Sequence, residues 1–169
     1  MKWEKNAHII KSVIIAAILF LIDAMLLNTN YIALATLLIV LPALLVKAAL
    51  ARKDRPRLKQ ILAAAGIYAL MALSIISMNK LNNRIAVHRT KTLAAACERY
   101  RSKYGAYPNR LVDLSPEFMP AVPAAKIGLA PEPFRYIASR NRHTLLYVEA
   151  PPFGIRMYNL EEKKWRQLD

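Results

Sequence analysis

The chain has 169 residues, 56% of them hydrophobic, and its 25 Lys and Arg against 11 Asp and Glu leave a net charge of +14. This composition excludes a disordered basic tail and a wholly soluble enzyme, and the single cysteine, Cys97, excludes a disulfide-framed secreted domain. The two properties occupy different regions: residues 1–79 hold three acids and nine bases, and residues 80–169 hold eight acids and sixteen bases. A membrane anchor followed by a charged domain is therefore predicted.

Three apolar stretches precede residue 80, at about 9–27, 31–50 and 61–79. Each has roughly the 20 residues that a helix needs to cross a hydrocarbon core. Helices of a soluble bundle normally have a polar face, and these stretches have almost none. We predict three transmembrane helices. No small-residue cleavage site follows the first stretch, so we expect it to be a retained anchor.

Lys and Arg residues near the apolar stretches indicate the orientation. The 28–30 connection has no base, whereas six bases opposed only by Asp54 follow the second stretch: Lys47, Arg52, Lys53, Arg55, Arg57 and Lys59. Positive loops stay in the cytoplasm, so the N-terminus is predicted to be cytoplasmic and residues after 80 periplasmic, in a bacterial inner membrane. The last five of these bases are expected to set the topology and contact lipid headgroups. Nucleic acid is not expected, because no aromatic side chain accompanies them.

Asp23 is the one acid within a predicted span, and it lies about 6 Å below the end of the first helix. An intramembrane acid suggests a proton relay or an interhelical contact. At this shallow depth, a carboxylate that reaches the outer interface is about equally expected. The other spans offer no acid, His or Arg to complete a relay, which gives little support to a transporter. Pro42 is expected to kink the second helix.

After the third stretch the sequence continues to favour a helix, because residues 79–104 contain neither Pro nor Gly. Residues 80–91 are expected to form a helical stalk. Residues 92–104 present an apolar stripe at helical spacing, as in a helix lying on a core. The stripe consists of Leu93, Ala96, Cys97, Tyr100 and Tyr104. The third span and this helix would then form one continuous rod.

Gly105 and Pro108 end the predicted helix. Eight of the ten prolines lie between residues 108 and 152, which excludes long helices there. Short strand patterns follow at 134–138, 144–149, 155–160 and 164–168, separated by turn residues, and they predict an antiparallel meander. The predicted fold class is therefore α+β: three transmembrane helices, the third continuing into a long amphipathic helix packed on a small antiparallel sheet over residues 92–169.

The segment after the stripe follows the pattern Tyr-x-x-x-Tyr-Gly-x-Tyr-Pro-x-x-Leu-x-x-Leu-x-Pro. This pattern resembles type IV pilins and the major pseudopilins of type II secretion, and the matching residues are Tyr100, Tyr104, Gly105, Tyr107, Pro108, Leu111, Leu114 and Pro116. The resemblance implies a long helix packed on a small sheet and a role in filament assembly or protein contacts. Two differences stand out: the prepilin processing motif is absent, and two further spans precede the helix. The acidic calcium loop of many pseudopilins is also missing. We therefore predict a pilin-like domain on a polytopic anchor.

Motifs for catalysis or cofactors are scarce, and we expect no enzyme, metal or cofactor. Cys97 and His88 point to opposite sides of one helix, and Cys97 lies in the apolar stripe, as an inert packing thiol would. The densest basic group of the second half consists of Arg135, Arg140 and Arg142, which we predict to bind a partner.

The sequence thus favours a non-enzymatic inner-membrane protein with a periplasmic pilin-like module. Its expected partners are membrane lipids and other membrane or periplasmic proteins, without nucleic acid or a small-molecule substrate. The module would act in pilus or pseudopilus assembly, or as an accessory subunit of a membrane complex. Two alternatives stay open: a small membrane enzyme or transporter that uses Asp23, and a sensor module that binds an envelope polymer.

Overall fold

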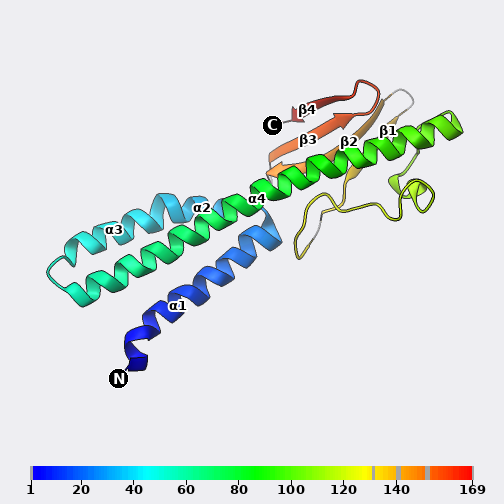
Figure 1. Ribbon diagram of the computed structural model, residues 1–169. Coiled ribbons are helices and arrows are strands. Elements are labelled where there is room, and N and C mark those ends of the chain that lie inside the picture. The colour runs from blue at the N-terminus through cyan, green and yellow to red at the C-terminus, as the bar shows by residue number, and fades with distance from the viewer. Residues whose placement is uncertain (1, 131, 140–141, 151–152, 169) are drawn as a thin grey trace. The chain divides into compact units, whose positions relative to one another are not determined.

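The computed structural model describes residues 2–130, 132–139, 142–150 and 153–168 (Figure 1). The chain divides into two compact units, residues 1–79 and 80–169. We call the first the membrane unit and the second the module. One long helix, α4 (Arg55–Tyr104), contributes its first half to the membrane unit and its second half to the module.

The membrane unit consists of helices at the three positions predicted from hydropathy. The first helix comprises α1 (Lys2–Phe20) and the π-helical segment η1 (Leu21–Leu27). The second comprises α2 (Tyr31–Ala35), the π-helical segment η2 (Thr36–Val40) and α3 (Leu41–Leu50), and α4 is the third. Three helices are long and apolar enough to cross a membrane, which confirms the prediction at the level of length and composition.

In both π-helical segments, backbone hydrogen bonds join residues five apart in place of the four of an α-helix. Each ends with an i→i−5 hydrogen bond: the Asn28 N–H donates to the Asp23 carbonyl at 2.6 Å, and the Leu41 N–H donates to the Thr36 carbonyl. The second segment ends two residues before Pro42, which lies in the first turn of α3, where its missing N–H costs least. The kink expected at Pro42 stays a prediction, and the structure shows a π turn on the N-terminal side of this proline.

Small residues form much of the core of the membrane unit. Ala24, Ala33 and Ala72 have no exposed surface, and Met71 and Ile75 pack among them. Larger apolar side chains mostly point outwards, as Leu38 (73% exposed) and Leu50 (83%) do. This distribution is typical of helices surrounded by lipid, where small side chains allow the backbones to approach and large ones face the acyl chains.

The module is a four-stranded antiparallel sheet packed against the second half of α4. The strands β1 (Arg135–Ser139), β2 (Arg142–Ala150), β3 (Phe153–Asn159) and β4 (Lys164–Leu168) lie in the order β1-β2-β3-β4. A short 3-10 helix, η3 (Leu111–Leu114), lies in the connection between α4 and the sheet. The mixed fold, the four-stranded meander and the packing of the long helix on the sheet are therefore confirmed.

The core of the module contains most of the predicted stripe. Leu93, Ala96 and Cys97 are fully buried, and Tyr100 packs against them. From the sheet and the connection, the core receives Leu114, Leu145, Tyr147 and Leu160. The prediction was wrong for Tyr104, which is 52% exposed, because its ring packs at a tilt against Tyr100 and its hydroxyl donates to Glu117 at the surface.

Packing on α4 begins earlier than the stripe suggested. Asn82, Ala86 and Thr90 belong to the expected stalk, yet all three are buried within the module. The Thr90 hydroxyl donates to the Ala86 carbonyl one turn before it, which satisfies this polar group inside the helix. The small side chain of Ala86 and the internally bonded hydroxyl of Thr90 thus allow the rest of the module to pack closely on this part of α4. The sequence did not predict this packing, because no large apolar residue marks it.

Candidate interaction surfaces

Asp23 has no exposed surface, and five donors surround its carboxylate. One oxygen, Oδ1, accepts hydrogen bonds from the Thr29 N–H (3.2 Å), the Thr29 hydroxyl (2.7 Å) and the Asn30 N–H (2.8 Å). The other, Oδ2, accepts from the N–H groups of Ile32 (2.8 Å) and Ala33 (3.2 Å), the otherwise unpaired donors at the start of α2. The geometry gives Asp23 a structural role: it closes the 28–30 turn and caps the second helix.

The same turn is linked to the third helix of the membrane unit. The Asn79 side chain donates from Nδ2 to Oδ1 of Asn30 at 2.6 Å. Asn30 adopts a left-handed backbone conformation with φ of 70°, which asparagine tolerates better than most residues. Asn30 and Asn79 therefore lie at the same level of the membrane unit, at the ends of the second and third apolar stretches.

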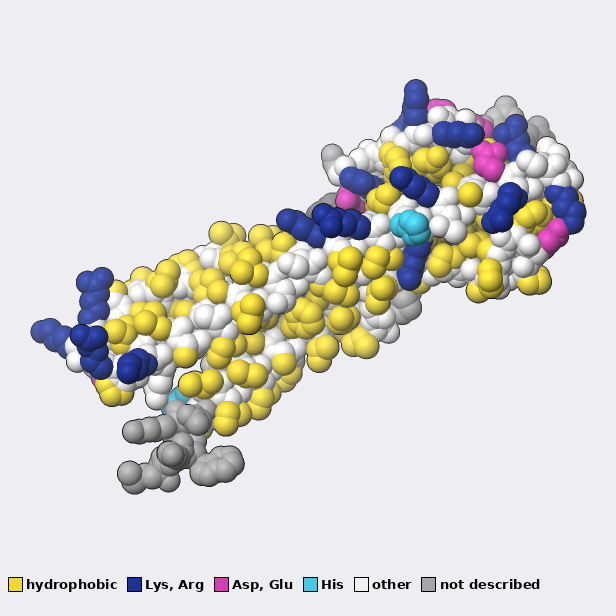
Figure 2. Space-filling model, in the orientation of Figure 1, with side chains coloured by type: hydrophobic (Ala, Val, Ile, Leu, Met, Phe, Trp, Pro, Cys, Tyr) yellow, Lys and Arg dark blue, Asp and Glu magenta, His cyan; other side chains and the backbone are white. Residues whose placement is uncertain are grey.

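The predicted topogenic bases lie together in and after the turn that joins α3 to α4. All five are exposed: Arg52, Lys53, Arg55, Arg57 and Lys59. In Figure 2 the dark blue side chains gather at this end of the membrane unit, next to a largely apolar surface. The Asp54 carboxylate accepts the Arg57 N–H at 3.1 Å and caps α4, so it is engaged with the backbone. This arrangement offers several exposed cations to phosphate groups.

The arginines predicted to bind a partner do not form one group. Arg135 and Arg142 are both exposed, while Arg140 lies outside the described residues. Arg135 pairs with Leu146 and Arg142 pairs with Ser139, at opposite ends of the β1–β2 ladder. Arg142 and Leu146, the partner of Arg135, are four residue steps apart along β2, a span of about 13 Å. Nearness in the sequence therefore does not place these two residues at the same end of the β1–β2 ladder.

Arg135 instead borders a small hollow on the sheet. The hollow has a volume of about 120 Å³ and is lined by Glu132, Pro133, Arg135, Leu146, Tyr147, Val148 and Ile155. Its two charged lining residues, Glu132 and Arg135, are both exposed. Burial raises the pKa of Tyr147, so its hydroxyl stays protonated.

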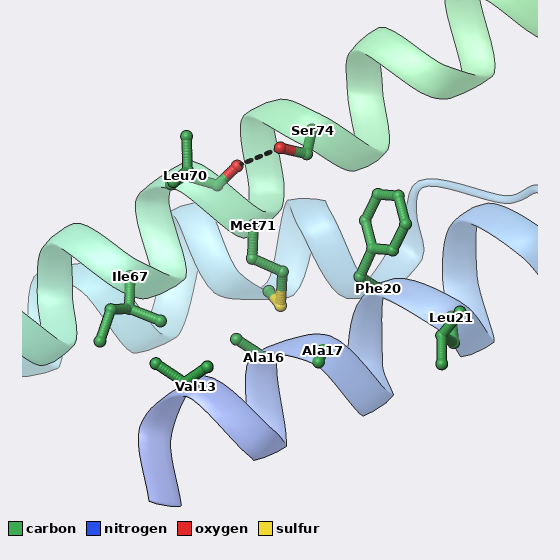
Figure 3. A pocket seen from close by; sticks show the side chains of 9 residues that line it. All are labelled: Val13, Ala16, Ala17, Phe20, Leu21, Ile67, Leu70, Met71 and Ser74. Carbon is green, nitrogen blue, oxygen red and sulfur yellow. Dashed lines mark hydrogen bonds between the residues drawn. The ribbon is translucent and has the colours of Figure 1, made fainter. Parts of the chain in front are cut away.

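A larger groove of about 530 Å³ lies in the membrane unit between the first and third helices (Figure 3). Five of the lining residues come from the first helix and four from the third: Val13, Ala16, Ala17, Phe20 and Leu21, and Ile67, Leu70, Met71 and Ser74. The Ser74 hydroxyl donates to the Leu70 carbonyl at 2.8 Å and is engaged within its own helix. The groove can therefore receive apolar groups and offers no free polar anchor among these nine residues.

Tyr107 anchors the segment after α4 to the helix, a role that its position in the motif did not reveal. Its hydroxyl donates to Glu98 Oε1 at 2.9 Å and accepts from the Arg101 guanidinium at 3.2 Å. Burial, together with the bond to Glu98, raises the pKa of Tyr107. The guanidinium also lies 4.9 Å from the centre of the tyrosine ring. Tyr107 therefore acts as a clamp that returns the chain to α4.

A second polar contact, missed from the sequence, joins β2 to the turn before β4. His143 Nδ1 lies 2.6 Å from Glu161 Oε1, and the His143 backbone N–H also donates to this carboxylate. Burial opposes ionisation, yet the bonds from His143 hold the pKa of Glu161 below its usual value. The His143 ring packs 4.9 Å from the Tyr107 ring. His143 thus contacts both Glu161 and Tyr107 and links the sheet to the segment after α4. We assign it a structural role.

Groups with catalytic potential are dispersed over the described part of the chain. Cys97 is buried, and burial raises the pKa of its thiol from 9.0 to about 12, which suppresses the nucleophilic thiolate. His88 lies exposed on the same helix. Among the described residues, no three His, Cys, Asp or Glu side chains gather as metal ligands would.

Comparison with models of protein families, with curated proteins and with solved structures found no match to this chain. The fold and the surfaces described above are therefore the basis for a functional assignment.

Proposed function

We propose that the chain is a non-enzymatic protein of the bacterial inner membrane that presents a pilin-like module for contacts with other proteins. The observation that carries the proposal is the continuity of α4, one helix of 50 residues that begins in the membrane unit and packs on a four-stranded antiparallel sheet in the module. A helix that leaves the membrane and covers a small meander is the arrangement that pilins use.

The motif that suggested pilins has a mechanical role in this fold. Gly105 ends α4 with φ of +79°, Tyr107 clamps the following segment to Glu98, and the Tyr136 hydroxyl donates to the Pro108 carbonyl at 2.9 Å. Leu111 and Leu114 are buried in the core. The motif thus ties the helix end to the sheet, which supports a pilin-like architecture, whereas the two additional helices argue for a subunit that stays in the membrane.

In this proposal the N-terminus is cytoplasmic and the module is periplasmic. The five exposed bases around the α3–α4 turn would stay on the cytoplasmic side, as positively charged loops do. The module would then contact membrane or periplasmic proteins, either in assembling a pilus or pseudopilus or as an accessory subunit of another membrane complex.

The test is affinity purification of the full chain from membranes in a mild detergent, followed by identification of stoichiometric partners. We expect other envelope proteins to be retained. Arg135→Glu and Arg142→Glu should be compared with Lys164→Glu, which changes the charge on the opposite edge strand by the same amount. Loss of a partner with one arginine variant alone would assign the contact to one end of the β1–β2 ladder. Recovery of a lone monomer would contradict the proposal.

The envelope-polymer alternative makes a different prediction for the same variants. A polymer sensor would bind isolated cell-wall or glycan material through Arg135 and Arg142 and would lose that binding when both are changed. The roughly 13 Å between their positions favours an extended partner over a compact ligand, and an extended polymer meets that condition as a protein does. A sedimentation assay with purified polymer separates the two.

A further inference from the structure

A loop of the module exposes large apolar side chains close to the point where α4 leaves the third apolar stretch. Residues 127–130 read Ile-Gly-Leu-Ala, and Ile127 is 45% and Leu129 71% exposed. Apolar surface left in water is unfavourable relative to burial. An apolar phase that covers these two side chains would therefore be favoured.

The loop is held at this position by Asn82, which has no exposed surface. The Asn82 side chain donates from Nδ2 to the Ile127 carbonyl at 2.9 Å, and its Oδ1 accepts the Ile127 N–H at 3.2 Å. This paired contact imitates one rung of a β-ladder and fixes the backbone of Ile127 against α4. The position of the loop along α4 thus follows from the position of Asn82.

Asn82 lies four residues after Met78, the last apolar residue of the third stretch. Asn79, which closes this stretch, is level with the polar 28–30 turn through its bond to Asn30. Asn82 follows Asn79 by three residues, about 4.5 Å along a helix. Headgroups occupy roughly 5–8 Å on each side of the hydrocarbon core, so a third span that ends at Met78 would place Asn82 and the Ile127 backbone in the headgroup layer.

The charges near the loop suit the same layer. Lys126 is turned inwards, 4% exposed, with Nζ donating to the Glu149 carbonyl at 2.8 Å, so the loop tip itself presents no cation. On α4, Lys80 and Arg84 are exposed at the level of Asn82. Arg84 borders a hollow of about 260 Å³ together with Asn83, Val87, Glu149 and Arg156. Exposed cations at this depth are placed to meet lipid phosphates.

We propose that the 127–130 loop inserts the side chains of Ile127 and Leu129 into the bilayer interface on the side of the 28–30 turn, while Lys80 and Arg84 contact lipid phosphates. The occupant of this apolar surface is the lipid bilayer. The inference does not depend on the protein-contact function, because it rests on the position of Asn82 relative to the third span and on the exposure of the loop.

The test places a fluorescent probe on Leu129→Cys in the full chain reconstituted into vesicles of phosphatidylethanolamine and phosphatidylglycerol. An environment-sensitive nitrobenzoxadiazole group is attached through the new thiol. Val112→Cys is the matched control, because Val112 is 57% exposed and lies in η3, after the end of α4. The parent chain serves as the labelling blank, since its Cys97 is fully buried.

We expect the probe at position 129 to emit at shorter wavelength, to lose fluorescence to a nitroxide carried near the lipid headgroup, and to resist aqueous iodide. The probe at position 112 should respond to iodide alone. Quenching of both probes by iodide alone would overturn the proposal. Shielding of position 129 from both quenchers would also overturn it, because a protein surface would then cover the loop.

Two further variants test the individual steps. Asn82→Ala in the Leu129→Cys chain should reduce quenching by the lipid nitroxide, since the loop loses its link to α4; unchanged quenching would overturn the role of Asn82. Lys80→Gln with Arg84→Gln should remove any stronger quenching seen in phosphatidylglycerol vesicles compared with phosphatidylcholine vesicles. Equal quenching in both lipids for the parent pair would contradict the contact with anionic phosphates.

Discussion

At the scale of single residues, Asp23 and Cys97 are two buried polar groups with different environments. Asp23 carries an acceptor-rich carboxylate, and the turn supplies five donors to it. Cys97 lies among apolar side chains, which penalise its charged form. From the sequence alone, Asp23 could serve as a proton carrier and Cys97 as a nucleophile. The residues that surround them in the structure indicate a structural role for both.

Asp23→Asn should destabilise the membrane unit by about 2 kcal/mol, because the amide nitrogen would face N–H donors that now bind an oxygen. The measurement is the midpoint of denaturant unfolding in detergent, followed by circular dichroism. Asp54→Asn is the matched control: Asp54 caps α4 in an exposed turn, where asparagine caps equally well. A transporter that used the Asp23 charge would instead lose its activity with the stability and protein level unchanged.

The buried Cys97 should make the free energy of unfolding fall as the pH rises above 9. Its folded-state pKa is raised to about 12 by burial and by Glu98, so the thiol ionises first in the unfolded chain. The stabilising contribution is therefore complete below pH 9 and is lost as pH rises towards 12, by up to about 1.4 kcal/mol per pH unit. Comparison of the chain with Cys97→Ala in unfolding experiments between pH 8 and pH 10 isolates this contribution. An identical pH slope in both would contradict it.

At the scale of elements, the helix ends are defined by local backbone chemistry. α4 ends where Gly105 adopts φ of +79° and donates its N–H to the Arg101 carbonyl at 2.8 Å. α2 begins where Asp23 supplies its cap, and α3 begins beside Pro42. Each of these three helix ends thus depends on one residue: Gly105 for its left-handed backbone, Asp23 for its capping carboxylate and Pro42 for its missing N–H.

Gly105→Ala should destabilise the module by about 1 kcal/mol, because a side chain in the left-handed region is strained. No atom lies within 4 Å of the position that a Cβ would occupy, so the cost comes from the backbone alone. Gly105→Asn should cost less, since asparagine tolerates this region. Trp165 packs on Tyr158 in the module, so its fluorescence in a Trp3→Phe background reports module unfolding. Equal losses in the two variants would point to crowding instead.

Hydropathy and spacing predicted the elements well and their side-chain partners poorly. The spans and strands could be predicted because a long apolar run such as 61–79 is typical of a transmembrane helix, and a short apolar run between turn residues, such as 144–149, is typical of a strand. The cap by Asp23, the Asn82–Ile127 pairing and the Tyr107 clamp were not, because each joins groups whose partner depends on the folded backbone. Arg135 and Arg142 show the converse: residues close in sequence are separated once the β1–β2 hairpin forms.

At the scale of the whole molecule, charge and hydropathy are sorted by region. The membrane unit concentrates exposed bases at the α3–α4 turn, and the module carries a net charge of +8 from sixteen bases and eight acids. A partner in solution would therefore meet a moderately basic module. The bases of the α3–α4 turn would instead determine the orientation of the helices in the membrane.

A periplasm-active reporter fused after Asp169 should be active if the module is exported. Replacing the five bases of the α3–α4 turn by glutamine should reduce the active fraction, because the difference in positive charge across the spans is then largely removed. Replacing Arg135 and Arg142 by glutamine is the control and should leave the reporter unchanged. An inactive reporter in the parent fusion would reverse the orientation and the assignment to the periplasm together.

The Asp23 cap has a consequence for the order in which the protein is built. All five donors to its side chain come from residues 29–33, so the first two helices can satisfy this buried group without the third. Contacts so close in sequence form early, since little chain entropy is lost in closing them. Asn79, 49 residues beyond Asn30, reaches the same turn only later in synthesis. We therefore expect the first two helices to form a capped pair before the third helix and the module join them.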